Sequence, residues 1–358
     1  MAINENLLNP RRRSPLAVPL VVVALFALVG GAFLLGRASA PEAGREPATA
    51  AATAAPAAAD ADADDTDVDA AVAAIPPPSA HTAMGDPLPG TKGLRRLDVK
   101  VQGSLSATIN GVIGAEVGDP LALVTSRLLV WWLDVARDLR PGDHLELIYE
   151  LPENSEPVVH ALRFRSGKQG RRFEAYRHQL PSSRFAHYYD EDGKEVEQRL
   201  ESSPIDAYEQ VTSLLKDGRR HKGVDFKAPV GTPVTMPWAG VVRRKNWNYR
   251  ANGGSLEIED TRGRRILFLH LSEIAKGIDA GTRVAKGQKV ALSGNTGRST
   301  APHLHYQVMS SAGKVLDPFD LHETYRRAIP AGEKDGYLAA VRDLSAHFAG
   351  ADLAADAP

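Results

Sequence analysis

Two histidines of this chain, His303 and His305, stand two residues apart in the segment APHLHYQVM. The segment alternates as a β-strand does, and residues two apart on a strand lie on one face. A second group, His221 and Asp225, lies in HKGVDFKAP, where Gly223 permits a sharp local bend. The sequence therefore offers imidazole and carboxylate groups that can meet at one metal ion.

The metal that suits these groups is Zn²⁺, which binds neutral imidazole and carboxylate without thiolates. The chain has no cysteine, so any metal site must use His, Asp and Glu. Three protein ligands with an open fourth position are the arrangement of a catalytic zinc. His270, in ILFLHLS at the end of an expected strand, is a further candidate residue for this site.

Each group has an ordinary structural interpretation when taken alone. A histidine pair on a strand is more often a surface pair than a metal site, and a strand-end histidine can simply bond to the backbone. The order and grouping of His221, Asp225, His270, His303 and His305 favour a shared site. The remaining histidines have no such grouping and are expected to be structural or surface residues: His81, His144, His160, His178, His187, His322 and His347.

The elements expected to position these residues are short strands separated by Gly and Pro turns, from about residue 206 to 322. This regular spacing predicts an antiparallel β-sandwich or barrel. No arrangement of a nucleophilic Ser or Cys is apparent, so we do not expect a covalent intermediate. Asn295 and Ser299, in SGNTGRST, either shape the wall of a groove or serve only as turn residues.

A smaller α+β domain is expected over residues 91–205. The segment PLALVTSRLLVWWLDVARDL has apolar residues at helical spacing and predicts one helix over roughly 120–139. HLELIYEL and VVHALRFR alternate as strands do. Residues 323–358 are expected to form a tail with an amphipathic helix in GYLAAVRDLSAHFAG.

The N-terminus has the features of a membrane anchor. Arg11–Arg13 lie in an expected cytoplasmic segment, 1–14, and precede an uncharged apolar stretch, 15–36, long enough to cross a membrane as a helix. We expect a single-pass protein of the inner membrane, with a disordered Ala/Pro/Asp-rich linker over 37–90 and the rest in the periplasm. The alternative is a signal peptide cleaved near Ala40, which releases a periplasmic form.

The charge of the chain does not indicate a nucleic-acid partner. The 43 Lys and Arg residues nearly balance the 44 Asp and Glu residues, for a formal net charge of -1 at pH 7. A strongly basic balance would favour nucleic acid, so no such partner is expected here.

The segments HKGVDFKAPVGTPV, AGVV, FLHLS and VAKGQKVALSGNTGRSTAPHLH, in this order, resemble the lysostaphin-like (LytM-type) zinc endopeptidases. The resemblance covers about residues 218–318 and implies an antiparallel β-sandwich of the LytM type. It also implies one Zn²⁺ per catalytic domain, bound by His221, Asp225 and His305.

The resemblance further implies hydrolysis of peptide bonds in the stem peptides or cross-links of peptidoglycan. His303 and His270 correspond to the histidines that assist catalysis in the family. We expect His303 to be the general base and His270 to stabilise the oxyanion, and an exchange of these roles stays open. Likeness to Gram-negative members favours a D,D-endopeptidase that cuts 4–3 cross-links.

The chain departs from the family pattern at several positions. Phe268 stands where relatives often have Tyr, and Ala301 stands where Gly is common. TSLLKDGRR precedes His221 in place of a Ser-x-Phe-Gly-x-Arg segment, and NYRANGGS replaces a shorter Gly-Asn turn. Residues 91–205 resemble, through DLRPGDHLELIYE and YYDEDGKEV, a domain that precedes the peptidase in Gram-negative murein endopeptidases and can cover the groove.

Three other functions are alternatives to an endopeptidase of the cell wall. Some LytM-type relatives lose zinc ligands and act as activators of other wall hydrolases, but the motif residues are all kept here. The segments PVTMPWAGVV and AKGQKVALSG have the rhythm of a biotin or lipoyl carrier, but no lysine stands at a suitable hairpin tip. A peptidase for a protein substrate outside the wall is the third alternative.

Overall fold

The computed structural model describes residues 85–215 and 221–348. The expected cytoplasmic segment 1–14 and membrane helix 15–36 lie outside these ranges. Within the described ranges, no helix combines the length and the apolar character that a membrane crossing requires.

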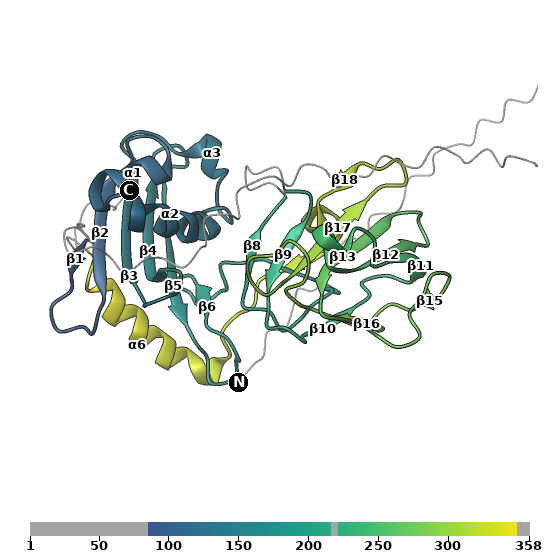
Figure 1. Cartoon of the computed structure of the whole chain (residues 1–358). Helices are drawn as coiled ribbons and strands as arrows, with labels where there is room; N and C mark the ends of the chain where they lie inside the picture. The colour runs from purple at the N-terminus through teal and green to yellow at the C-terminus, as the bar shows by residue number, and fades with distance from the viewer. Residues whose placement is uncertain (1–84, 216–220, 349–358) are drawn as a thin grey trace, which may run out of the picture. The chain divides into compact units, whose positions relative to one another are not determined.

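The first sheet has six strands in the order β1-β2-β3-β4-β5-β6, each antiparallel to its neighbour (Figure 1). Its strands are β1 (Asp86–Pro87), β2 (Arg95–Lys100), β3 (His144–Glu150), β4 (Val158–Ser166), β5 (Arg171–His178) and β6 (His187–Tyr189). β3 and β4 confirm the strands expected from HLELIYEL and VVHALRFR. β1 falls within the expected linker 37–90 and is paired with β2, so the expected end of the linker at residue 90 is wrong.

Two helices, α1 (Leu105–Ile113) and α2 (Ala115–Leu129), pack on one face of this sheet and share a buried core with it. The single helix expected over 120–139 is wrong, because α2 ends at Leu129 and a separate short helix, α3 (Val135–Asp138), follows. The side chain of Asp134 accepts hydrogen bonds from the backbone N–H groups of Ala136 and Arg137. This N-cap favours a new helix start over continuation.

The C-terminal helix α6 (Lys334–Ser345) packs on the opposite face of the same sheet. Tyr337 of α6 is fully buried, and its hydroxyl donates a hydrogen bond to the backbone oxygen of Asp190 (2.6 Å). The helix expected in the C-terminal tail is therefore confirmed. Because helices cover both faces, residues on both sides of β3 and β4 are apolar and buried, as Leu147 and Ile148 illustrate.

The second part of the fold contains two further sheets. The larger has eight strands in the order β15-β11-β12-β13-β17-β9-β8, with β18 paired to β17, and the smaller has the order β10-β16-β14. The larger sheet comprises β8 (Gln210–Ser213), β9 (Val224–Lys227), β11 (Gly240–Lys245), β12 (Gly254–Asp260), β13 (Arg265–Leu271), β15 (Arg283–Val284), β17 (His303–Met309) and β18 (Val315–Leu316). The smaller comprises β10 (Pro233–Thr235), β14 (Glu273–Ile274) and β16 (Lys289–Leu292).

These two sheets enclose one hydrophobic core. Val234 and Val290 come from the smaller sheet, and Phe226, Phe268 and Leu304 come from the larger, all essentially inaccessible to solvent. The mostly β fold expected here, two antiparallel sheets around a shared core, is confirmed. The domain boundaries expected near residues 205 and 322 stay predictions.

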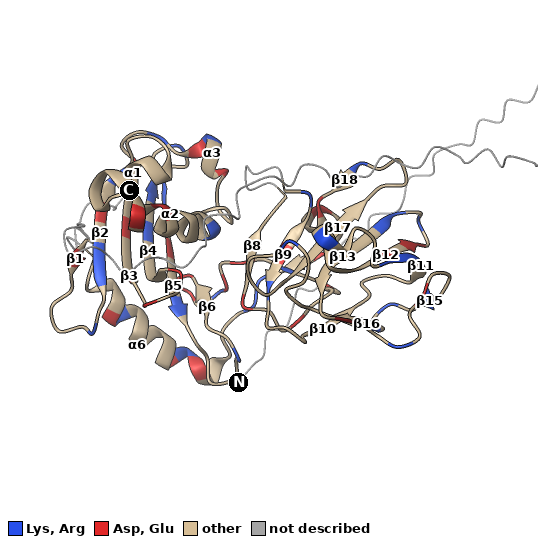
Figure 2. Cartoon of the chain, viewed as in Figure 1, with Lys and Arg blue, Asp and Glu red and all other residues tan. Residues whose placement is uncertain are grey.

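Short elements complete the described chain: β7 (Arg199–Leu200), α4 (Tyr249–Asn252), α5 (Pro318–Leu321), β19 (Thr324–Tyr325) and the 3₁₀ turn η2 (Ala331–Glu333). Figure 2 shows acidic and basic segments interspersed along the larger sheet. Some of them form cross-strand ion pairs, such as Arg244 with Glu257 (2.7 Å) between β11 and β12. Such pairs between facing strands help to keep their alignment.

His187 on β6 links the stability of the fold to pH. Burial lowers the pKa of His187 to about 4, and the nearby Arg199 acts in the same direction. Below the ordinary value of 6.5 the unfolded chain binds more protons, so stability is lost as the pH falls toward 4. We expect His187→Gln to remove about 3 kcal/mol of that acid-induced loss, measured by urea unfolding at a series of pH values. Parallel pH curves for the wild type and the variant would contradict this.

Candidate metal centre

Strand pairing brings the candidate ligands together. β9 and β17 are antiparallel neighbours, and their register sets Asp225 directly opposite His305. Residues opposite each other on adjacent strands have Cβ atoms about 4.5–5.5 Å apart, so a carboxylate and an imidazole can reach a common point. The His305 and Asp225 side chains are both largely buried.

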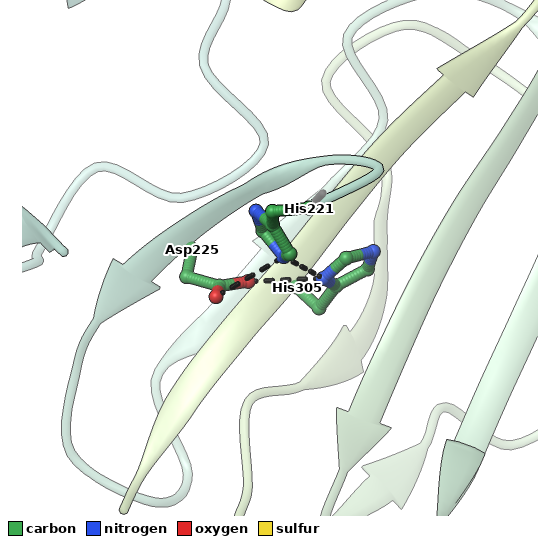
Figure 3. A group of neighbouring side chains, drawn as sticks. All are labelled: His221, Asp225 and His305. Atoms are coloured by element: carbon green, nitrogen blue, oxygen red, sulfur yellow. Dashed lines mark hydrogen bonds and ion pairs between the residues drawn. The ribbon is translucent and has the colours of Figure 1, made fainter. Parts of the chain in front are cut away.

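His221 reaches the same point from the segment that precedes β9. Its Nε2 lies 3.0 Å from Nδ1 of His305 and 3.2 Å from Oδ2 of Asp225, while Nδ1 of His305 lies 2.9 Å from Oδ1 of Asp225 (Figure 3). Gly223 permits this approach, because a Cβ at its position would lie 2.8 Å from Cε1 of His305. The three expected zinc ligands therefore converge, with one ligand atom from each within 4.8 Å of the others.

The outer nitrogen of each histidine in this candidate ligand set is held by a polar side chain. We assign Nδ1–H of His221 as the donor to Oγ of Ser213 (2.8 Å), and Nε2–H of His305 as the donor to Oε1 of Gln307 (3.4 Å). In these tautomers both remaining ring nitrogens point lone pairs at the carboxylate of Asp225. Two lone pairs and an anion facing one another repel unless a cation lies between them, so the donor set fits Zn²⁺.

The charge state of Asp225 agrees with a role as a metal ligand. Burial opposes ionisation of this carboxyl group, but in the metal-free chain His221 and His305, when they carry protons toward the carboxylate, hold its pKa well below the usual value. Asp225 is therefore a carboxylate over the whole physiological pH range. An ionised oxygen ligand is what a zinc site built without cysteine requires.

Two more histidines border the ligands. The ring centroids of His270 and His303 are 4.8 Å apart, and Nε2 of His303 lies 3.8 Å from Oδ1 of Asp225. We assign Nδ1–H of His303 as the donor to the backbone oxygen of Ala301 (2.8 Å) and Nδ1–H of His270 as the donor to the backbone oxygen of Thr296 (2.9 Å). With Nδ1 as the donor in each ring, Nε2 is the nitrogen that can accept a proton or a hydrogen bond.

His270 has an unusual backbone conformation, with φ of 60° at the end of β13. A residue with a β-carbon in the left-handed region costs on the order of 1–3 kcal/mol, and such residues cluster at functional sites. Burial, with the neighbouring His303 acting in the same direction, lowers the pKa of this imidazole to about 3. His270 is thus a neutral imidazole held in a strained position beside the ligands.

The structure brings together all the residues that the sequence singled out for the site, namely His221, Asp225, His270, His303 and His305. Of the loop residues left open, Ser299 lies 3.2 Å from Nδ1 of His303 through its Oγ, and Asn295 is exposed. His322 lies outside the site, where its ring nitrogens are hydrogen-bonded to the hydroxyl of Tyr306 and to the backbone oxygen of Glu201.

Sequence reasoning missed Ser213, Gln307 and Thr296. Gln307 was within reach of the alternation rule, since it lies two residues beyond His305 on the same strand. Ser213 contacts His221 from β8, the edge strand beside β9, and no local pattern announces that pairing. Thr296 contributes a backbone oxygen, which any residue type has.

Residues 219–318 match peptidase family M23. They form a peptidase family M23 domain. The M23 match covers almost the same range as the lysostaphin-like resemblance that the sequence motifs predicted, about 218–318, and that prediction is confirmed.

Two curated relatives and one solved structure illustrate what the chain is similar to. Peptidoglycan DD-endopeptidase ShyA of Vibrio cholerae is 31% identical over 278 residues, which cover 72% of this chain and 60% of ShyA. Glycyl-glycine endopeptidase ALE-1 of Staphylococcus capitis is 38% identical over 97 residues, which cover 27% of this chain and 26% of ALE-1. A zinc-containing peptidase from Vibrio cholerae is 27% identical, covering 63% of this chain and 70% of that one, with a TM-score of 0.30. The chain thus spans less than two thirds of the length of these curated relatives.

The contact between Ser213 and His221 predicts an effect on metal affinity. Ser213→Ala removes the acceptor that fixes the tautomer of His221, and loss of such a partner typically weakens metal binding about 10–100-fold. The affinity of the full chain for zinc is measured by competition with a chromophoric chelator.

A matched control for this prediction is Ser272→Ala. The Ser272 hydroxyl lies in the same domain and donates to the backbone oxygen of Ser293 (2.7 Å), and among the described residues it has no hydrogen bond to His221, Asp225 or His305. We expect its zinc affinity to equal that of the wild type. Equal affinities in the two variants would show that Ser213 does not support the metal ligand.

Proposed function

We propose that this chain is a zinc-dependent endopeptidase that hydrolyses the peptide cross-links of bacterial peptidoglycan, as a D,D-endopeptidase. The observation that carries the proposal is the convergence of His221, Asp225 and His305 beside His270 and His303. The M23 match supports a metallopeptidase, and the similarity to a relative named as a peptidoglycan DD-endopeptidase supports the substrate.

In this proposal His221, Asp225 and His305 hold one Zn²⁺. When bound, zinc supplies Lewis acidity, which lowers the pKa of water and polarises a peptide carbonyl. The remaining steps belong to the side chains of the protein, because the reaction also needs a proton acceptor and a proton donor.

His303 is the proposed general base. Its Nε2 is the free ring nitrogen, and it lies near the ligating carboxylate of Asp225 (3.8 Å from Oδ1). After Nε2 takes a proton from the attacking water, the imidazolium can pass that proton to the leaving amine. The backbone oxygen of Ala301 keeps the ring oriented through both transfers by accepting from Nδ1–H.

His270 is proposed to stabilise the oxyanion across from His303. Its neutral ring presents Nε2 as an acceptor, so donation to an oxyanion requires that Nε2 first carry a proton. The same geometry would let His270, instead of His303, take the proton from water. The two assignments differ in which histidine substitution removes the general base. The exchange of roles that the sequence left open therefore depends on whether Nε2 of His303 or Nε2 of His270 accepts the proton of the water.

For the whole chain we propose attachment to the inner membrane through residues 15–36, with the M23 domain in the periplasm. The support is the sequence alone: Arg11–Arg13 precede an uncharged stretch of sufficient length. Fractionation of cells that express the full chain, with an antibody against the C-terminus, is the measurement. Recovery of the full-length chain in the membrane fraction is expected, and a shortened soluble product would show cleavage near Ala40 instead.

The activity is tested with the full chain loaded with zinc and incubated with isolated peptidoglycan. We expect cross-linked dimers to disappear and monomeric stem peptides to appear in the mass spectrum of the muropeptides. His303→Ala should slow this release about 10²–10⁴-fold, the usual worth of general acid–base catalysis, and a chelated sample should release nothing.

His347→Ala is the control variant, a histidine outside the site that we expect to be fully active. Zinc bound at one equivalent without any cleavage would contradict the enzyme and favour a wall-binding regulator. Cleavage at a bond other than the D,D cross-link would contradict only the assigned bond.

A further inference from the structure

Thr296 lies where three segments around His270 meet. Its hydroxyl donates to the backbone oxygen of Leu271 (2.8 Å), the residue that follows His270, and accepts from the backbone N–H of Gly254 (2.9 Å), where β12 begins. Its own backbone oxygen accepts from Nδ1–H of His270 (2.9 Å). One residue therefore fixes the end of β13, the start of β12 and the ring of the histidine.

The packing around Thr296 leaves this residue little freedom to move. A Cβ at Gly253 would lie 2.3 Å from Oγ1 of Thr296, and a Cβ at Gly297 would lie 2.2 Å from the backbone nitrogen of Gly253. The backbone N–H of Arg298 donates to the backbone oxygen of Ala251 (2.8 Å) and joins the same two loops again. The backbone carbonyl of Thr296, which holds His270, thus lies in a closely packed contact between two loops.

His270 depends on an external partner for its orientation. It is the residue before the last of β13 and has φ of 60°, a conformation that a histidine does not adopt by preference. A neutral imidazole has two tautomers, and the hydrogen bond at one nitrogen decides which form is present. A carbonyl at Nδ1 selects the Nδ1–H form and leaves Nε2 as the free acceptor beside His303.

We propose that Thr296 is a positioning residue for His270. The hydrogen bonds of the Thr296 hydroxyl hold the backbone carbonyl of Thr296 within bonding distance of Nδ1 of His270, and that contact selects the tautomer and the orientation of the ring. The part that concerns turnover rests on the proposed endopeptidase function, in which His270 acts on the substrate. The part that concerns the tautomer is a property of the folded chain and holds without it.

The chain offers variants that separate the hydroxyl from the bulk of the side chain. Thr296→Val keeps the shape but removes both hydroxyl bonds, and Thr296→Ser keeps the hydroxyl. Thr282→Val is a matched control, because the Thr282 hydroxyl also joins two backbone groups, accepting from Asp279 N–H (3.0 Å) and donating to the backbone oxygen of Gly277 (3.3 Å). That turn contacts no histidine of the site among the described residues.

The experiment uses the full chain with zinc and compares kcat, KM and zinc content on a cross-linked muropeptide. Thr296→Val should lower kcat about 10²-fold, the effect of a misplaced catalytic group, with zinc content unchanged. Thr296→Ser should restore kcat, and Thr282→Val should retain it.

The second readout is ¹⁵N NMR of the full chain labelled only at histidine, with His270 identified by the signals missing from His270→Asn. In the wild type and in Thr296→Ser we expect the Nδ1–H tautomer at His270, and in Thr296→Val a shift toward the Nε2–H tautomer. If the wild type cleaves nothing, the endopeptidase proposal fails while this readout still decides the tautomer.

Two results would overturn the proposal. One is a Thr296→Val variant with the kcat and the His270 signals of Thr282→Val. The other is a wild-type spectrum that shows the Nε2–H tautomer at His270, which decides the matter even where Thr296→Val does not fold.

Discussion

The register between β9 and β17 is the constraint on which the site depends. It sets Asp225 opposite His305 and, two residues along, Lys227 opposite His303. A slip of one residue would turn the whole histidine pair to the other face of β17, because side chains alternate with a period of two. The register is held from the other face, where Leu304 and Tyr306 are fully buried in the core between the two sheets. The hydrophobic core thus specifies the position of the candidate metal ligands from the opposite face of β17.

A second constraint follows from placing polar groups at this depth. A buried imidazole is held by a hydrogen-bond partner at one ring nitrogen, and that partner determines what the other nitrogen can do. Backbone oxygens of Thr296 and Ala301 hold the two non-ligating histidines, whereas side chains of Ser213 and Gln307 hold the two ligating ones. The same rule, applied four times, directs the other ring nitrogen of each histidine toward one small region.

The sequence predicted the residues that carry the chemistry of the site better than the residues that hold them in position. The HxH spacing and the HxxxD group indicated the candidate residues, because strand alternation and ligand chemistry are local rules, and the resemblance to the lysostaphin-like family implied which three of them are ligands. Ser213 was out of reach because its contact with His221 depends on the pairing of β8 with β9. The break between α2 and α3 was missed because helical periodicity runs through Asp134, whose capping bonds were not weighed against it. The packing of α6 on the first sheet joins segments far apart in the chain, which periodicity does not reveal.

The central claim is that His221, Asp225 and His305 hold one zinc ion, and X-ray absorption at the zinc edge of the purified full chain tests it most directly. The account predicts one zinc per chain in a shell of nitrogen and oxygen, with the scattering pattern of two imidazoles and no sulfur. His305→Ala should lose the ion or one of the imidazoles. A chain that retains no zinc, or a zinc shell that keeps both imidazoles in His305→Ala, would contradict the claim.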